Sequence, residues 1–147
     1  MYVNDPKKYC EIDHTADVGI YAQGDSYAEL FANAAFGMRH IIYGNITVAK
    51  KRTKTIKLCD STLSELMVRW LNEINFLLDV KDFLISCIGD LTVKTKEDQC
   101  CVKAELYGDN ASQYRSFQKL EIKAVTYHKL QFKKTDSKYY TQIIFDI

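Results

Sequence analysis

Two stretches of the sequence repeat apolar residues at the spacing of an amphipathic helix. The first, residues 26–44, has Ser26 followed three positions later by Glu29, the pattern of a capping box, and Gly44 is suited to closing its C-terminal end. The second, residues 61–80, repeats the same spacings. Both are therefore expected to form helices that pack through a wide apolar stripe. The apolar positions are Tyr27, Leu30, Phe31, Ala34, Ala35, Met38, Ile41 and Ile42 in the first stretch, and Leu63, Leu66, Met67, Trp70, Leu71, Ile74, Leu77 and Leu78 in the second.

Most of the remaining pattern predicts β-strands, which dominate the C-terminal half. In the first of them, alternation turns Val18, Ile20 and Ala22 toward the core and leaves Asp17 and Tyr21 facing away. We therefore predict an α+β fold, with two amphipathic helices packed on one face of a largely antiparallel β-sheet. The expected strands cover residues 18–22, 46–58, 83–88, 91–96, 101–107, 121–133 and 139–147.

Composition limits the classes of protein that remain. The 147 residues, with 47% hydrophobic and 27% charged, are typical of one globular domain, here residues 1–147, with residues 1–8 expected to be flexible. The 20 basic and 19 acidic residues nearly cancel, which argues against a protein that holds nucleic acid through a broad basic surface. A local basic patch stays open.

The cysteines and the apolar runs bear on location. The five cysteines are odd in number, form no C-x-x-C pair and follow no signal peptide, so we expect reduced thiols in an intracellular protein, cytoplasmic and/or nuclear if eukaryotic. No apolar run approaches the ~20 residues of a membrane span, so we predict a soluble protein with no membrane partner.

The candidate chemistry starts at "DHTADVGI", residues 13–20. Asp13, His14 and Asp17 crowd together just before a predicted strand, although acidic residues are poor strand formers. One explanation is a loop whose carboxylates bind local backbone amides. The other is a site for a hard cation or a partner contact, because Asp17 would sit exposed at the mouth of the strand.

The sequence ends in "QIIFDI", which adds the carboxylate of Asp146 and the α-carboxylate of Ile147. An ordinary acidic tail is one explanation. If the tail met Asp17, however, three negative charges would repel one another unless they shared a cation. Ligands that are all oxygen favour calcium, magnesium or manganese over zinc. The sequence alone does not place the two ends together.

Other motifs add little. Lys123, in "KAVTYH", faces outward in its predicted strand, where it is either solvated or in contact with a phosphate or an acidic partner. The sequence contains no nucleophile elbow, P-loop, G-x-G-x-x-G or H-E-x-x-H motif. No enzyme class is therefore indicated by a motif.

Five segments together resemble the archease family in order and spacing. They are "HTADVGI" near the N-terminus, "ELFANAAFGM", "LSELMVRWLNEINFLL", "KAVTYH" and the final "DI". The resemblance covers nearly the whole chain. The Asp-His-Thr-Ala-Asp opening together with an Asp-Ile ending is its most specific part.

The resemblance implies a function. Archease proteins are small α+β domains without catalysis of their own that activate an RtcB-type tRNA ligase, which joins RNA ends with GTP and a divalent metal. They promote guanylylation of the ligase and its multiple turnover in tRNA splicing, so RNA is reached through the ligase. The family's metal ligands fall on Asp17, Asp146 and Ile147, with Asp13 and His14 supporting them. Calcium is expected in the isolated protein, with magnesium or manganese as alternatives.

Two other functions stay open. A metal-dependent phosphoester hydrolase would use His14 as acid or base, with Asp17 and Asp146 as metal ligands. A general RNA-binding or chaperone module would bind RNA without the ligase, and the balanced charge speaks against it.

Overall fold

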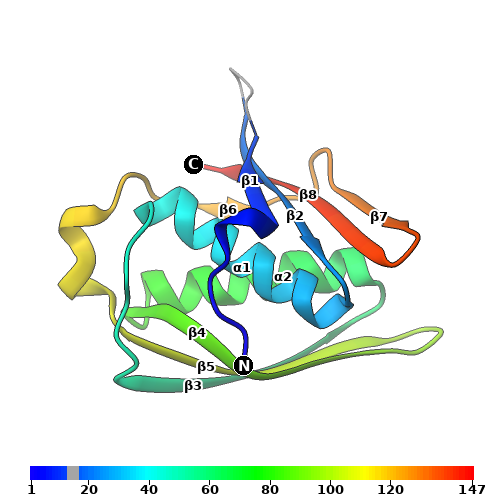
Figure 1. Ribbon diagram of the computed structural model, residues 1–147, viewed down its shortest axis with the longest axis horizontal. Helices are drawn as coiled ribbons and strands as arrows, with labels where there is room; N and C mark the ends of the chain where they lie inside the picture. The colour runs from blue at the N-terminus through cyan, green and yellow to red at the C-terminus, as the bar shows by residue number, and fades with distance from the viewer. Residues whose placement is uncertain (13–16) are drawn as a thin grey trace.

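The computed structural model describes residues 1–12 and 17–147, and its elements form three layers (Figure 1). Two helices, α1 and α2, lie in the middle layer, with a five-stranded sheet on one side and a three-stranded sheet on the other. The helices are α1 Tyr27–Tyr43 and α2 Leu63–Asp79, with short 3-10 helices η1 Pro6–Lys8 and η2 Ala111–Phe117. The strands are β1 Tyr9–Glu11, β2 Val18–Gly24, β3 Arg52–Asp60, β4 Phe83–Thr95, β5 Cys100–Asn110, β6 Ala124–Val125, β7 Gln131–Thr135 and β8 Lys138–Asp146.

Both helices form where the sequence predicts them, and their ends explain why. The backbone N–H of Glu29 donates to Ser26 Oγ at 3.1 Å, and Gly44, at φ 74°, donates its N–H to the His40 carbonyl at 2.7 Å. Thr62 caps α2 in the same way, accepting from the N–H of Glu65 at 3.1 Å. Among the described residues, no helix is long and apolar enough to cross a membrane.

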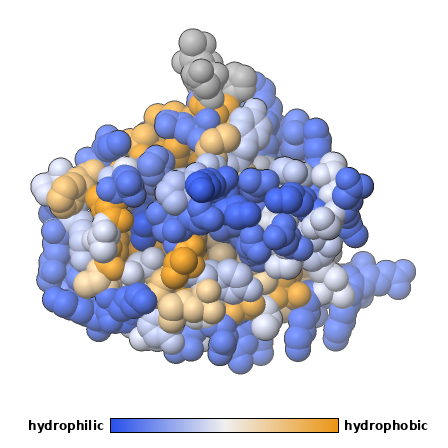
Figure 2. Space-filling view, viewed as in Figure 1, coloured by the Kyte–Doolittle hydropathy of each residue, from blue (hydrophilic) through white to orange (hydrophobic). Residues whose placement is uncertain are grey.

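The core lies between the helices and the two sheets. Trp70 of α2 is fully buried, and its indole N–H donates to the Phe31 carbonyl of α1 at 2.9 Å, which joins the helices directly. In the view of Figure 2, hydrophilic residues cover most of the surface and hydrophobic ones form smaller patches. The large apolar side chains are thus mostly enclosed.

The α+β class and the antiparallel pairing are confirmed. The five-stranded sheet has the order β1-β2-β8-β6, with β7 also paired to β8, and the three-stranded sheet has the order β3-β5-β4. The strands thus form two sheets, each with the helices on one face, where a single sheet was expected. The physical reason is visible in α1, because Ala32 and Phe36 lie outside its predicted stripe yet are fully buried. One sheet covers only one side of a helix, so α1 needs a second.

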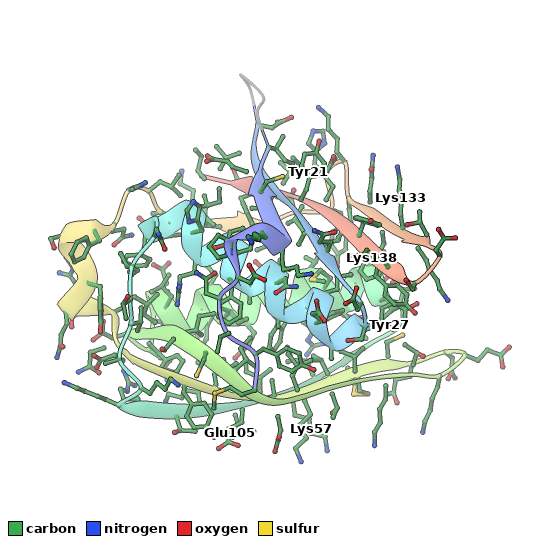
Figure 3. All side chains as sticks on the ribbon, in the orientation of Figure 1. Tyr21, Tyr27, Lys57, Glu105, Lys133 and Lys138 are labelled. Carbon is green, nitrogen blue, oxygen red and sulfur yellow. A yellow bond between two sulfur atoms is a disulfide. The ribbon has the colours of Figure 1, made fainter. Side chains whose placement is uncertain are left out.

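Figure 3 shows the resulting outer surfaces. Tyr21 and Lys133 lie at the five-stranded sheet, whereas Lys57 and Glu105 lie at the three-stranded sheet, on the opposite side of the helices. The molecule therefore exposes two separate sheet faces.

Several strand boundaries differ from the prediction. The strand expected over residues 121–133 is wrong as a continuous element, since β6 ends at Val125 and β7 begins at Gln131. Between them Lys129 has a φ of 52°, which a strand cannot accommodate. The two strands expected over 83–88 and 91–96 are one strand, β4, with an irregularity after Ile88. The strand expected over 46–58 begins only at Arg52.

The expectation of free thiols is wrong for two cysteines. Cys59 and Cys101 form a disulfide, because they are directly opposite each other in the β3–β5 register with 4.1 Å between their Cα atoms. Their sequence separation of 42 gives no hint of this pairing. Cys10, Cys87 and Cys100 are free thiols, as expected.

Candidate metal centre

Strands β2 and β8 bring the two ends of the predicted site together. They pair in antiparallel fashion along their length, and the last matched residues are Val18 and Phe145. The same register, continued by one position, sets Asp17 opposite Asp146. Facing residues of such a pair have Cα atoms about 4.5–5.5 Å apart. The pairing of β2 with β8 therefore places Asp17 beside Asp146, which the sequence alone did not determine.

Strand β6 approaches Asp146 from the other side. Ala124 is matched with Asp146, and the backbone N–H of Lys123 donates to the Asp146 carbonyl at 2.7 Å. Asp146, Ile147 and Lys123 are all exposed. We call Asp17, Asp146 and Ile147 the acidic tip. Lys123 therefore borders the acidic tip, while Asp13 and His14 lie outside the described residues.

Alternation along β8 explains why a carboxylate emerges at this point. Ile143 and Phe145 are 0% and 4% exposed and hold β8 in the core, so Asp146 turns toward the opposite, outer face. On β2, a Cβ added to Gly19 would collide with the carbonyl of Ile143. Only glycine lets the two strands approach so closely beside Asp17.

Asp17 already holds a cationic group. The Lys129 ammonium lies 3.0 Å from Asp17 Oδ2, and the side chains of Lys129 and Asp17 are 57% and 20% exposed. Lys129 lies in the segment between β6 and β7. Two hydrogen bonds hold this segment against β8: Thr126 Oγ1 donates to the Ile144 carbonyl at 2.9 Å, and the Gln142 side chain donates to the Lys129 carbonyl at 2.8 Å. The sequence carries no signal for this contact, because Lys129 is 112 positions from Asp17 and falls in a segment predicted as strand.

The donors at the acidic tip fit a hard cation. Two aspartate carboxylates and the carboxylate of Ile147 offer oxygen atoms only, the donor set of calcium, magnesium or manganese. The contact with Lys129 indicates that Asp17 attracts positive charge. Within residues 1–12 and 17–147, no three His, Cys, Asp or Glu side chains gather closely enough to hold a metal ion. A cation there would rely on the carboxylate of Ile147 and on water as well.

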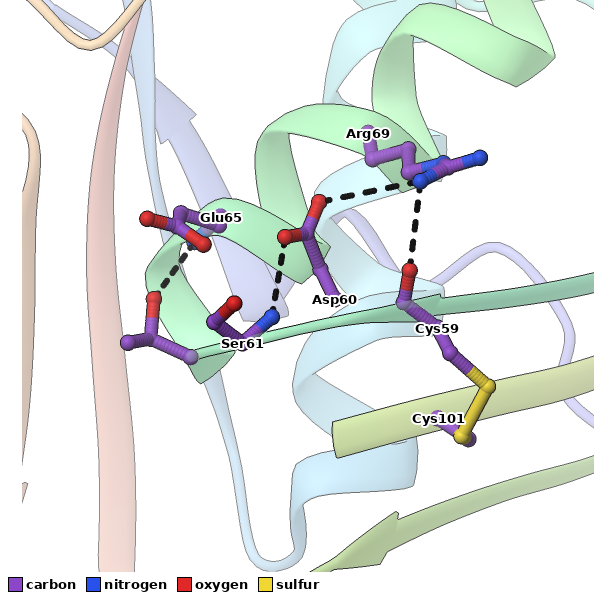
Figure 4. Close-up of polar contacts among 7 residues, drawn as sticks. Cys59, Asp60, Ser61, Glu65, Arg69 and Cys101 are labelled. Atoms are coloured by element: carbon purple, nitrogen blue, oxygen red, sulfur yellow. Dashed lines mark hydrogen bonds and ion pairs between the residues drawn. A yellow bond between two sulfur atoms is a disulfide. The ribbon is translucent and has the colours of Figure 1, made fainter. Parts of the chain in front are cut away.

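A second acidic pair lies at the start of α2 (Figure 4) and behaves differently. Asp60 accepts from the N–H of Ser61 at 2.8 Å and lies 3.9 Å from Arg69 Nη1. Hydrogen bonding to Asp60 raises the pKa of the exposed Glu65 carboxyl. Burial, with the Asp60 and Glu65 charges, raises the pKa of the nearby Tyr127 hydroxyl. These carboxylates are thus satisfied by a backbone amide, by Arg69 and by each other.

Comparison with known proteins decides the family. The model of the archease protein family matches residues 9–147. The chain belongs to the archease family. The archease of Pyrobaculum neutrophilum is 32% identical over 148 residues, covering 100% of both chains. That of Methanosarcina mazei is 30% identical over 141 residues, covering 96% of this chain and 97% of the relative.

Solved structures support the archease fold. The solution structure of Methanobacterium thermoautotrophicum protein 1598 superposes with a TM-score of 0.79 at 24% identity, covering 96% of this chain and 99% of the other. The crystal structure of a Thermotoga maritima protein, described as an archease and possible chaperone, has a TM-score of 0.52 at 21% identity, covering 100% and 99%. At these identities the likeness concerns the fold alone.

Proposed function

We propose that this archease is a non-catalytic activator of an RtcB-type RNA ligase. It promotes guanylylation of the ligase and multiple turnover in RNA joining, including tRNA splicing. Membership of the family supports this proposal. The single observation that carries it is the convergence of Asp17 and Asp146 at one exposed end of the β2–β8 pair.

The acidic tip is where this chain would act on the ligase. Asp17 and Asp146 would hold a divalent cation through their side chains, and Ile147 through its α-carboxylate. When bound, such a cation supplies the charge neutralisation that nucleotidyl transfer requires. Lys129 keeps Asp17 paired when the cation is absent. Lys123, exposed beside Asp146, is placed to contact a phosphate or an acidic group of the partner.

The experiment combines the ligase with GTP, manganese and this protein carrying no C-terminal tag. Asp17→Ala and Asp146→Ala are each expected to lower stimulation of guanylylation and of multiple-turnover joining about tenfold or more, in line with losses seen around metal sites. Asp25→Ala is the matched control, because Asp25 is an exposed carboxylate just beyond the other end of β2 and pairs with Lys138 at 3.7 Å.

Calorimetry with calcium and manganese gives a second measurement that does not involve the ligase. Both tip variants are expected to lose cation binding, and a C-terminal extension is expected to weaken it by removing the α-carboxylate of Ile147. Full stimulation by both tip variants would refute the proposed role. Turnover of a phosphoester by the isolated protein would indicate a hydrolase instead.

A further inference from the structure

The outer face of the five-stranded sheet carries aromatic and amide side chains in register. Tyr21 is 41% exposed and faces Gln142 across the β2–β8 pair, while the next outward position of β2, Gln23, faces Tyr140. Tyr21 and Tyr140 are therefore diagonal neighbours on adjacent strands. Across β8, Gln131 faces Gln142 and Lys133 faces Tyr140. We call this surface the tyrosine face: Cys10, Tyr21, Gln23, Gln131, Lys133, Tyr140 and Gln142.

Two shallow grooves cross the tyrosine face, each of about 240 Å³. Both are lined by Tyr21 and Tyr140. One continues to Lys7 and Lys8, and the other continues to Lys133. The two rings therefore lie between lysine-bearing ends.

The charged residues that line the two grooves are all lysines. No member of the tyrosine face, and no residue lining either groove, is an aspartate or glutamate. Within residues 1–12 and 17–147, Lys7, Lys8 and Lys133 form no ion pair. Lysines at the ends of grooves that no carboxylate lines attract a polyanion, although the Asp5 carboxylate lies close by, accepting from the backbone N–H of Lys7 at 3.1 Å.

Tyrosines, glutamines and lysines that are exposed or half-buried together match one chemistry. Single-stranded RNA is bound on sheets by stacking bases on aromatic rings, by hydrogen bonds to base edges, and by lysines at phosphates. We propose that the tyrosine face binds single-stranded RNA. A partner protein is favoured less, because lysine is depleted at protein–protein interfaces.

The proposal extends the proposed function, on which the choice of RNA rests. Asp17 immediately precedes β2 and is four positions from Tyr21, about 13 Å along the chain if the strand alternation continues to it. An RNA strand lying along β2 and β8 would thus run toward the acidic tip. The family resemblance implies that RNA is reached through the ligase, and the proposal adds a direct contact between RNA and this protein. Such a contact would place the RNA end beside the proposed cation.

The test measures binding of a fluorescein-labelled oligouridine RNA by anisotropy, with this protein alone and no ligase, over a series of salt concentrations. Tyr21→Ala and Tyr140→Ala are each expected to weaken binding about five- to 150-fold, the effect of losing one stacked base. Lys133→Gln is expected to reduce the slope of log affinity against log salt by about 0.7, the value for one phosphate contact on a single strand.

The three-stranded sheet offers matched controls. Tyr107→Ala and Lys57→Gln change the same residue types on the opposite outer face and are expected to alter neither affinity nor slope. Far-UV circular dichroism verifies that each variant is folded, and the exposed position of Lys133 keeps at least one variant free of a packing change.

Three outcomes would overturn the proposal. The wild type could show no salt-dependent binding, or the control variants could lose as much affinity as the tyrosine-face variants. In the third, Tyr21→Ala would lower ligase stimulation although the wild type binds no RNA, which would identify the face as a protein contact. None of these touches the proposed function, whose failure would appear as full ligase stimulation by Asp17→Ala.

Discussion

The two outer sheet faces contain similar residue types but arrange their charges differently. The three-stranded sheet also exposes lysines, with Lys57 facing Lys103 across the β3–β5 pair, and it also has a tyrosine, Tyr107. Unlike the tyrosine face, it mixes in carboxylates, since Asp90 and Glu105 line the same groove as Lys103. The grooves of the tyrosine face are thus lined by lysines and no carboxylate, whereas the groove of the three-stranded sheet is lined by charges of both signs.

The two faces also differ in the size of their grooves. The groove on the three-stranded sheet has about 810 Å³, against about 240 Å³ for each groove on the tyrosine face. Its opposite charges lie close together, so their fields largely cancel at a distance. Salt screens what remains beyond a Debye length of about 8 Å. A polyanion would therefore be attracted to the smaller grooves.

The largest effect is expected from removing the disulfide, which separates the two faces experimentally. The Cys59→Ser/Cys101→Ser variant is expected to lose about 2–4 kcal/mol of unfolding free energy, because the cross-link restricts the unfolded chain. Urea denaturation measures this loss. RNA affinity is expected to stay unchanged under native conditions, since the disulfide joins β3 to β5 in the other sheet.

Cys10→Ser is the matched control, because Cys10 is an exposed free thiol on the tyrosine face. It is expected to leave the unfolding free energy within about 0.5 kcal/mol of wild type. An RNA affinity that fell together with stability in the disulfide variant would show that the two faces are not independent.

The features predicted correctly are those determined by neighbouring residues. The two helices follow from apolar spacing and from local caps such as Ser26 and Thr62. Alternation likewise predicted that Tyr21 faces outward. By contrast, the division into two sheets and the Cys59–Cys101 disulfide depend on strand register, which residues far apart in the sequence determine together.

The acidic tip shows the same limit. The residues Asp17 and Asp146 stand out as motifs at the two ends of the chain, but their proximity depends on the β2–β8 register. Lys129 has no motif at all, and its contact with Asp17 requires the break between β6 and β7. Tyr140 joins the proposed RNA-binding surface only because the register sets it diagonal to Tyr21.

A smaller effect is expected at the acidic tip when the Lys129 ammonium group is removed. Lys129→Met keeps a long side chain but deletes the ammonium that lies 3.0 Å from Asp17 Oδ2. An exposed pair of this kind contributes little, so calcium affinity measured by calorimetry is expected to rise only about two- to fivefold. Lys133→Met removes the same charge from the tyrosine face and is expected to leave calcium affinity unchanged.

The pair of lysine variants also sharpens the contrast between tip and face. Lys133→Met is expected to lower RNA affinity more than Lys129→Met does, because Lys129 is already paired with a carboxylate. A calcium affinity that falls in Lys129→Met would mean that the ammonium supports the site rather than competing with the cation.

The smallest effect is expected at the Asp60–Glu65 pair, where interaction with the Asp60 carboxylate raises the pKa of Glu65 and Arg69 is the nearby cation. Because the pKa of Glu65 is raised in the folded protein, the folded chain holds this proton more tightly than the unfolded chain does. The resulting stability is present below the unfolded pKa and is lost as pH rises through the folded value. NMR titration should show Glu65 above its ordinary range in wild type and in Asp25→Ala, and closer to that range in Asp60→Ala. An unchanged Glu65 titration in Asp60→Ala would show that Asp60 does not raise the pKa of Glu65. The Asp60–Glu65 pair could then no longer be contrasted with the acidic tip as a carboxylate pair that binds a proton rather than a metal ion.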